Sequence, residues 1–216
     1  MDRPPSGQPA RRGFDEAYQQ AYEMASLRLR ETADLHALCR RSGAMLADEA
    51  GKKVISLDYL GQPCRVVLPD VDVSTASGEP LSPRDLLIIL HYLNTADGSL
   101  LTDRLITFKE LPEGAVYYPT YVKRTIKPLL DKFADRPESL IAAAESIGGV
   151  KAETGDFSFR LKALPRVPLT ITLWLGDKEL PPEGNILFDS SITDYLPTED
   201  ITVLCEILAW KLVRLG

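Results

Sequence analysis

The residues in this chain best suited to chemistry are carboxylates that gather among its last thirty positions, beside apolar segments. Within twelve positions the sequence holds Asp189, Asp194, Glu199 and Asp200. Carboxylate oxygens are ligands for hard cations, and two carboxylates with separated pKa values suit general acid–base catalysis. A structural interpretation competes. In it Asp189 caps a short element, Thr198 caps the long helix, and Glu199 and Asp200 complement the positive N-terminal end of the helix dipole. The spacing matches no calcium-loop or two-metal motif, so both interpretations stay open at this point.

A further acid, Asp177, follows an apolar strand expected over 168–175. If this strand pairs antiparallel with the one expected over 186–188, we expect Asp177 near Asp189, with Asp194 close by. Asp177 and Asp189 would then hold the metal of a metal-dependent hydrolase as its first candidate ligands, with Asp194 or Glu199 as the third ligand. The competing interpretation is an Asx turn, in which Asp177 opens the loop after its strand.

Two other side chains complete the ligand pocket that this pairing predicts. Tyr118 belongs to an aromatic segment before a helix, where tyrosines favour ligand stacking or a protein contact. Arg166 lies in the turn between two strands and suits an anionic group. The predicted pocket is therefore lined by Asp177, Asp189, Tyr118 and Arg166. The structural alternative for the tyrosines is that they wedge their loop onto the core.

Other motifs that carry chemistry are missing from the sequence. The two histidines, His36 and His91, have no metal-ligand spacing. A triad of His91 with Asp189 and a neighbouring serine lacks the G-x-S-x-G elbow. The sequence contains no P-loop, no G-x-G-x-x-G and no H-E-x-x-H. The three cysteines are far apart without a C-x-x-C, so we find no iron–sulfur or nucleotide motif and leave the cofactor unknown.

Composition limits the class of protein. The 216 residues carry a formal net charge of −6, and 44% of them are hydrophobic, as in an ordinary globular chain. The acidic balance argues against a nucleic-acid partner, which favours a basic face, and no apolar run reaches the roughly 18 residues of a membrane span. Sparse cysteines indicate a reducing, cytoplasmic setting. We expect a disordered tail over 1–13, rich in Pro, Gly and Arg, and a single domain over 14–216.

Hydrophobic periodicity predicts which elements position these residues. Helical spacing and helix-start signals predict helices over 14–31, 32–41, 82–93, 122–133, 137–147 and 198–214. Alternating or continuous apolar runs predict strands over 44–47, 54–60, 64–68, 105–109, 157–164, 168–175 and 186–188. The strands come in pairs with short turns and the helices come in groups. This order predicts an α+β fold, a mostly antiparallel sheet in hairpins packed against a central buried helix and a long C-terminal helix.

The predicted C-terminal helix has two apolar stripes. One stripe runs through Ile201, Leu204, Cys205, Leu208 and Leu212, and a second contains Val203, Ile207 and Trp210. A helix with two apolar sides is either sandwiched in the core or in contact with a partner subunit. The second reading is the basis of a homodimer hypothesis.

Several stretches taken together resemble one domain family. They are the segments 87–93, 106–114, 164–168, 174–177, 186–190 and 196–201. In this order they are similar to an uncharacterised family found mostly in anaerobic bacteria and archaea, and the match covers about residues 14–216. Some members look fused to a cysteine-rich iron–sulfur segment similar to that of corrinoid one-carbon proteins. This chain has no such segment, so the resemblance implies a link to anaerobic redox or corrinoid-type metabolism without cluster binding.

Three hypotheses follow for the function. The first is a ligand-binding or accessory protein of that metabolism, without a complete catalytic site, which holds a small molecule or a protein partner. The second is the metal-dependent hydrolase, and the third is the homodimeric interaction module.

Overall fold

A computed structural model describes residues 9–78 and 80–216 of the protein, and it describes side chains in the first helix from Ala17 onward. The chain forms helices α1 (Pro9–Arg30), α2 (Leu35–Ser42), α3 (Pro83–Thr95), α4 (Gly114–Arg124), α5 (Ile126–Phe133), α6 (Pro137–Glu145) and α7 (Thr198–Leu215), with short 3-10 helices η1 (Phe108–Glu110) and η2 (Ser190–Asp194). Its strands are β1 (Met45–Glu49), β2 (Lys52–Tyr59), β3 (Gln62–Val67), β4 (Asp72–Thr75), β5 (Leu105–Ile106), β6 (Val150–Lys151), β7 (Phe157–Leu164), β8 (Val167–Trp174) and β9 (Glu183–Asp189).

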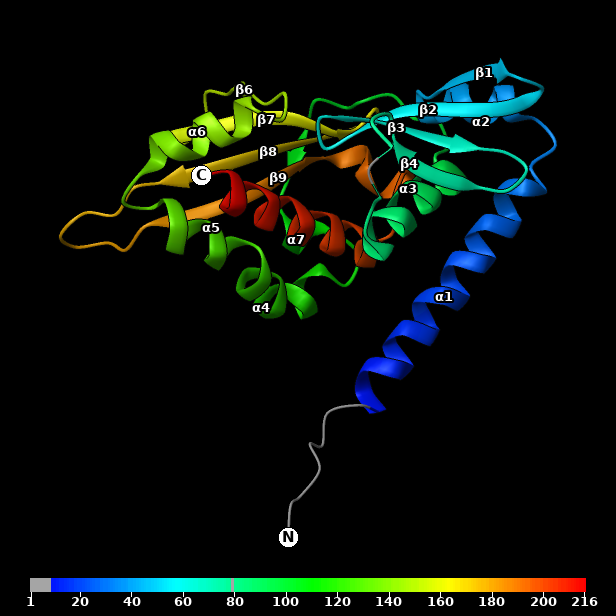
Figure 1. Cartoon of the computed structure of the whole chain (residues 1–216). Helices are drawn as coiled ribbons and strands as arrows, with labels where there is room; N and C mark the ends of the chain where they lie inside the picture. The colour runs from blue at the N-terminus through cyan, green and yellow to red at the C-terminus, as the bar shows by residue number, and fades with distance from the viewer. Residues whose placement is uncertain (1–8, 79) are drawn as a thin grey trace, which may run out of the picture.

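The predicted α+β class is confirmed, and the described strands form two antiparallel sheets. The four-stranded sheet has the order β1-β2-β3-β4, and the five-stranded sheet has the order β5-β9-β8-β7-β6. In Figure 1 helices α4, α5 and α7 lie on one side of the five-stranded sheet, and α3 lies beside the four-stranded sheet. The predicted hairpins β2–β3 and β7–β8 are present with short turns.

Two helices form the centre of the core, as the sequence predicts. Buried residues of α3 include Ile88, Ile89 and Leu90, and the first predicted stripe of α7 is buried along its length. The second stripe of α7 is only half-buried, and Trp210 keeps 45% of its surface exposed. The buried side chains of both sheets belong to one continuous cluster, so the sheets and helices share a core. No helix within the described part of the chain is long and apolar enough to cross a membrane.

Local sequence signals explain where several elements begin and end. At the start of α3, the Ser82 side chain accepts from the Asp85 backbone N–H, the Asp85 carboxylate accepts from the Ser82 N–H, and Pro83 occupies the first turn. Gly43 ends α2 in the left-handed conformation, with φ of 70°. Two predicted caps are wrong. Asp34 rather than Thr32 caps α2, and Thr198 bonds the Pro112 carbonyl instead of capping α7.

Three other predictions at this level are corrected by the structure. The expected loop 69–81 contains β4, and the expected loop 110–119 contains most of α4, which accommodates Pro119 within the helix. The expected strand over 105–109 is reduced to two residues, because Thr107 and Glu110 form a capping box that starts η1. The predicted tail over 1–13 lies largely outside the described residues, and α1 already begins at Pro9 (Figure 1).

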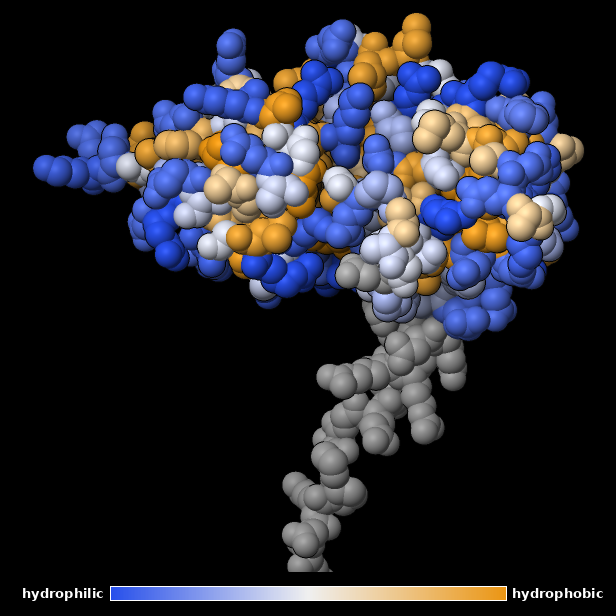
Figure 2. Space-filling model, turned by 45° about the horizontal axis from the view of Figure 1, so that its top comes forward, coloured by the Kyte–Doolittle hydropathy of each residue, from blue (hydrophilic) through white to orange (hydrophobic). Residues whose placement is uncertain are grey.

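The five-stranded sheet has one face toward the helices and a second face that carries charged and apolar side chains. Because strand residues alternate between faces, Arg160 and Lys162 of β7 lie on the face opposite to the buried Phe159 and Leu161. Val150 of β6 pairs with Arg160 and shares its face. Figure 2, in which the top of Figure 1 comes forward, shows hydrophobic residues interspersed among hydrophilic ones.

Candidate functional site: a groove between the two sheets

The predicted pairing of Asp177 with Asp189 is wrong, because the two residues lie at opposite ends of β9. Strands β8 and β9 do pair antiparallel, with Trp174 opposite Glu183 and Leu169 opposite Phe188. Asp177 therefore lies in the loop that joins the two strands, near Glu183 at the start of β9. Asp189 lies six residues beyond Glu183, about 20 Å along the strand at the usual strand rise. The metal-dependent hydrolase required these carboxylates to share one site, so that hypothesis loses its geometric basis.

Asp189 is a buried structural carboxylate with a full set of donors. It accepts hydrogen bonds from the backbone N–H groups of Thr102, Asp103 and Ser191 and from the Thr102 and Ser191 hydroxyls, at 2.7–3.1 Å. Burial alone raises the pKa of a carboxyl, but the bonds from Ser191 and Thr102 outweigh it and lower the pKa of Asp189 to about 2. The predicted cap on η2 is therefore confirmed, and the same side chain also holds the loop before β5.

The other two predicted acids lie on the surface. Asp177 makes the Asx turn of the competing interpretation, since its Oδ1 accepts from the backbone N–H groups of Glu179 and Leu180 at 2.7 and 2.9 Å. These bonds lower the pKa of its carboxyl. Asp194 is exposed, and its backbone carbonyl accepts a hydrogen bond from the Asp97 N–H. Among the described residues, no group of three or more His, Cys, Asp or Glu side chains is placed to hold a metal ion.

The contacts of Tyr118 are with residues other than the acids that were predicted to share its pocket. It lies on α4, where Lys109 places its Nζ 4.2 Å from the ring centroid and Tyr121 stacks at 6.2 Å. The cation–π contact and the partial burial of the ring give this tyrosine a packing role.

Arg166 is the predicted residue that does line a large hollow. This first hollow has a volume of about 610 Å³ and lies where the outer face of the four-stranded sheet meets the β7–β8 turn. Its lining includes side chains from β1, β2, β3, β7 and the turn: Met45, Glu49, Ser56, Asp58, Arg65, Lys162, Pro165 and Arg166.

The backbone of Arg166 is held in place by Tyr92 from the buried helix α3. The Arg166 N–H donates to the Tyr92 hydroxyl oxygen at 3.0 Å, and that hydroxyl donates in turn to the carbonyl of Ser42. Gly43 lets the turn approach closely, because a Cβ there would lie 3.1 Å from the Pro165 Cβ and 3.3 Å from the Arg166 Nε. The Arg166 Nε is buried and has no hydrogen-bond partner in the described part of the chain. A buried donor without an acceptor is costly, and this atom lies against Gly43 rather than toward the open hollow.

The charges around the first hollow leave cations without partners. Arg65 makes an ion pair with Glu49 across the sheet. Neither Lys162 nor Arg166 makes a side-chain ion pair or hydrogen bond with any residue that the structure describes, and Asp58 is the free carboxylate of the hollow. In a chain of net charge −6, unpaired cations beside a hollow attract an anionic group.

A second hollow of about 660 Å³ adjoins the first. It shares Asp58, Pro63, Lys162 and Pro165 with the first hollow, so these four residues form a common wall. Beyond this wall the lining is mostly apolar, with Leu101, Ile147, Val150, Leu161 and Pro168, together with Arg160. We call the two hollows together the groove.

Sequence reasoning found Arg166 but missed Arg65, Lys162 and Arg160. The alternation of residues along β3 and β7 places Arg65, Arg160 and Lys162 on the outer faces of the sheets. This alternation could be predicted from the sequence. Their convergence was not readable, because it depends on a contact between the two sheets, marked by the bond from Leu60 N–H to the Ala163 carbonyl at 2.9 Å.

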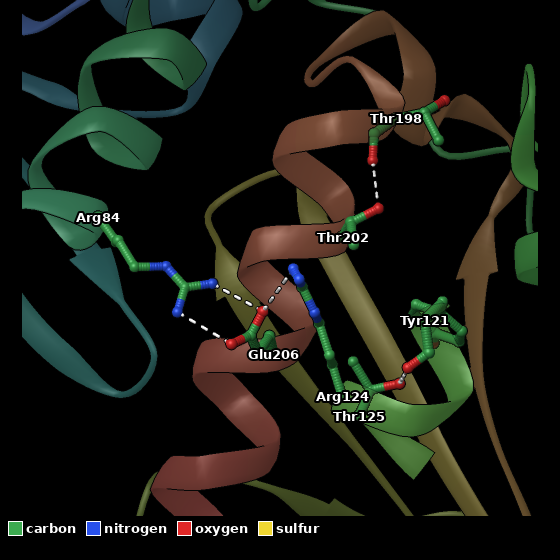
Figure 3. A network of polar contacts seen from close by, with 7 residues as sticks. All are labelled: Arg84, Tyr121, Arg124, Thr125, Thr198, Thr202 and Glu206. Atoms are coloured by element: carbon green, nitrogen blue, oxygen red, sulfur yellow. Dashed lines mark hydrogen bonds and ion pairs between the residues drawn. The ribbon is translucent and has the colours of Figure 1, made fainter. Parts of the chain in front are cut away.

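A second polar cluster joins helices α3, α4 and α7 (Figure 3). Arg84 and Arg124 reach Glu206 from opposite sides, as Figure 3 shows. Arg84 makes a bidentate pair with Glu206 at 3.0 and 2.9 Å, whereas Arg124 stands 3.9 Å away. Each of the three charged side chains has a charged partner, so the cluster ties helices together and is not the best ligand site.

A pair of a histidine and an aspartate joins the two central helices, α3 and α7. His91 Nδ1 of α3 and Asp200 Oδ2 of α7 are 2.8 Å apart, which raises the pKa of His91 despite its partial burial. The partner of His91 is thus Asp200, 109 positions along the chain, and not the Asp189 of the hypothetical triad.

Comparison with known proteins completes the description. A search among curated proteins found no match, and a search among solved structures found none either. A family model described as "Domain of unknown function (DUF3786)" matches residues 34–211, from the residue that caps α2 to the last turns of α7. Since that match covers most of the chain, the protein belongs to the family of the domain of unknown function DUF3786.

Proposed function

We propose that this protein is a binding protein for a small organic anion and that the groove between the two sheets is its site. The observation that carries the proposal is that Arg166 and Lys162 line the first hollow without an ion-pair partner among the described residues, and that Tyr92 holds the Arg166 backbone in place. Arg160 adds a further cation in the second hollow, and it too makes no ion pair with any residue that the structure describes. Lys162 and Arg166 around the first hollow favour the binding of a carboxylate or a phosphate. The planar guanidinium of Arg166 can donate two parallel hydrogen bonds to either group.

The lining of the groove favours binding over covalent catalysis. The lining holds the Ser56 hydroxyl and the Cys64 thiol as nucleophiles, and burial raises the pKa of that thiol to about 11. A thiol with such a pKa is protonated at neutral pH and is a poor nucleophile. Asp58 stands in the shared wall without a histidine beside it in the lining. We therefore propose an accessory role in which the ligand is held and presented rather than converted.

The resemblance to families of anaerobes supplies the proposed setting, which is redox or corrinoid-type metabolism in the cytoplasm. The three cysteines are free and buried, which is consistent with a reducing compartment.

The test is a binding screen on the full chain with two matched variants. Thermal unfolding and calorimetry would be run with phosphate, short monocarboxylates and short dicarboxylates. We expect at least one of them to raise the melting temperature of the wild type, since a ligand that binds the folded state stabilises it. Arg166→Gln should lower the affinity for that ligand by roughly 10- to 100-fold, because the substitution removes a charge-assisted hydrogen bond.

The matched control is Arg136→Gln, because Arg136 is exposed and lies outside the groove. It should bind the ligand as the wild type does. The proposal is wrong if no anion binds, or if Arg166→Gln and Arg136→Gln bind with equal affinity.

A homodimer through α7 is the second candidate. The observation in its favour is Trp210, which is 45% exposed on the helix face that also carries the half-buried Val203 and Ile207. An aromatic anchor of this kind is typical of interface centres. Light scattering should give a dimer mass for the wild type and a monomer mass for Trp210→Ser, and a monomer mass for both would remove the candidate.

A further inference from the structure

We infer that the ligand of the groove is an amphipathic anion, with one charged group at Arg166 in the first hollow and an apolar body in the second hollow. This inference rests on the proposed function and adds the chemical class of the ligand. It is carried by the contrast between the two hollows and by the wall that they share.

The volumes indicate a ligand larger than an inorganic ion. The hollows measure about 610 and 660 Å³. Because a water molecule takes about 30 Å³ in the liquid, each hollow has room for roughly twenty such groups. Both volumes fall within the range of sites for organic ligands. A phosphate or a short carboxylate held at Arg166 would therefore leave most of the groove unused.

The second hollow is suited to an apolar body. Val150 and Leu101 line it and are 62% and 37% exposed, so they would be covered by a ligand that extends from the first hollow. Ile147 and Pro168 also line this hollow and are themselves largely buried. Covering exposed apolar surface next to a charged anchor gives both affinity and orientation.

The shared wall places the charge at one end of the ligand. Lys162 lines both hollows, and Asp58 stands in the same wall without an ion-pair partner among the described residues. The Asp58 carboxylate repels a second anionic group midway along the groove. Arg160 lies in the second hollow, where its apolar stem can pack on the ligand while its charged end stays in water. A dicarboxylate that reaches from Arg166 to Arg160 is the competing class, and the test separates the two.

The test is calorimetry of the full chain with n-alkyl monophosphates from methyl to octyl, all below their micelle concentrations. We expect affinity to rise with chain length, by up to roughly fourfold for each methylene that becomes buried. Val150→Ser and Leu101→Ser should flatten this dependence on chain length. Val116→Ser, which removes an exposed valine of α4, is the matched control and should preserve it. Arg166→Gln should weaken every member of the series by a similar factor.

The outcomes separate this inference from the proposed function. An affinity that depends on Arg166 but not on chain length would overturn the amphipathic ligand and keep the anion site. Tighter binding of an alkane dicarboxylate than of the monocarboxylate of equal length would overturn the placement of charge at one end. Binding to phosphatidylglycerol vesicles without binding of free octyl phosphate would identify a lipid headgroup and overturn the free ligand. No binding of any anion would overturn the proposed function itself.

Discussion

Arg166 and Tyr92, which stand 74 positions apart, are joined by a hydrogen bond of 3.0 Å from the Arg166 backbone N–H to the Tyr92 hydroxyl oxygen. The same hydroxyl donates to the carbonyl of Ser42, so one buried phenol connects α2, α3 and the β7–β8 turn. The backbone of Arg166 beside the groove is therefore held in place by a core residue.

Tyr92→Phe should lower the free energy of unfolding by about 1–3 kcal/mol, because it leaves two backbone groups without their buried partner. The measurement is urea unfolding followed by fluorescence. Tyr22→Phe is the matched control, since it removes a single bond of 2.9 Å to the Val71 carbonyl at a partly buried site and should cost about 0.5–1.5 kcal/mol. A Tyr92→Phe variant as stable as the wild type would contradict this role.

Asp189→Asn should destabilise the protein by about 2–3 kcal/mol, because an amide NH₂ would face the N–H donors that the carboxylate now accepts. Urea unfolding at neutral pH is the measurement. Asp177→Asn is the control, and it should change stability little because Asp177 is exposed in a surface turn. Equal effects of the two substitutions would contradict the assignment.

Acid stability should depend on Asp189. Its pKa lies at about 2 in the folded protein, below its ordinary 3.8. A lowered pKa contributes stability that is present above about pH 4 and is lost as the pH falls toward 2, on the order of 2 kcal/mol. Unfolding measured between pH 6 and pH 2 should therefore show a steeper loss for the wild type than for Asp189→Asn. Parallel losses would show that Asp189 is not the group responsible.

The His91–Asp200 pair should give a pH dependence of the opposite sign. The hydrogen bond to Asp200 raises the pKa of His91 above its ordinary 6.5. Its contribution to stability is therefore complete below pH 6.5 and is lost as the pH rises through the raised pKa. Asp200→Asn should lower the pKa of His91 in an NMR titration and abolish this dependence. His36→Gln, at an exposed histidine, should preserve it, and a dependence that survives in Asp200→Asn would contradict the pairing.

Glu206→Gln should cost about 1.5–3 kcal/mol, because Glu206 is 16% exposed and holds Arg84 in a bidentate pair (Figure 3). Arg124→Gln should cost less than about 1 kcal/mol, since Arg124 is 59% exposed and 3.9 Å from the carboxylate. A double-mutant cycle between Arg84→Gln and Glu206→Gln should give a coupling energy well above that of the Arg124 pair. Equal coupling of both arginines would contradict the geometry.

Much of the fold was predictable because its signals are local. The capping box at Ser82, the C-terminal Gly43 of α2 and the buried stripe of α7 each follow from a few neighbouring residues. Helix α4 was missed because Pro119 and Gly114 are typical of loops, yet tertiary packing keeps the segment helical. The short strand β4 was missed because four residues carry too little periodicity.

The candidate site was less predictable, since its residues converge through contacts distant in sequence. Asp189 attracted a functional interpretation because a buried acid beside a strand is compatible with both a cap and a ligand. Only the donors of Thr102 and Asp103, 86 or more positions earlier, identify it as structural. Conversely, the sequence of β7 does not distinguish Lys162 from an ordinary exposed strand residue. Only the contact between the two sheets places it in the lining of both hollows.

The most direct test of the groove is a map of backbone amide chemical-shift changes on addition of octyl phosphate to the ¹⁵N-labelled full chain. We expect the largest changes at Arg166, Lys162, Arg65 and Val150, and we expect them to disappear in Arg166→Gln. Changes centred on the loop 175–182, or on the hollow between α1 and α3, with the groove unaffected, would contradict this expectation.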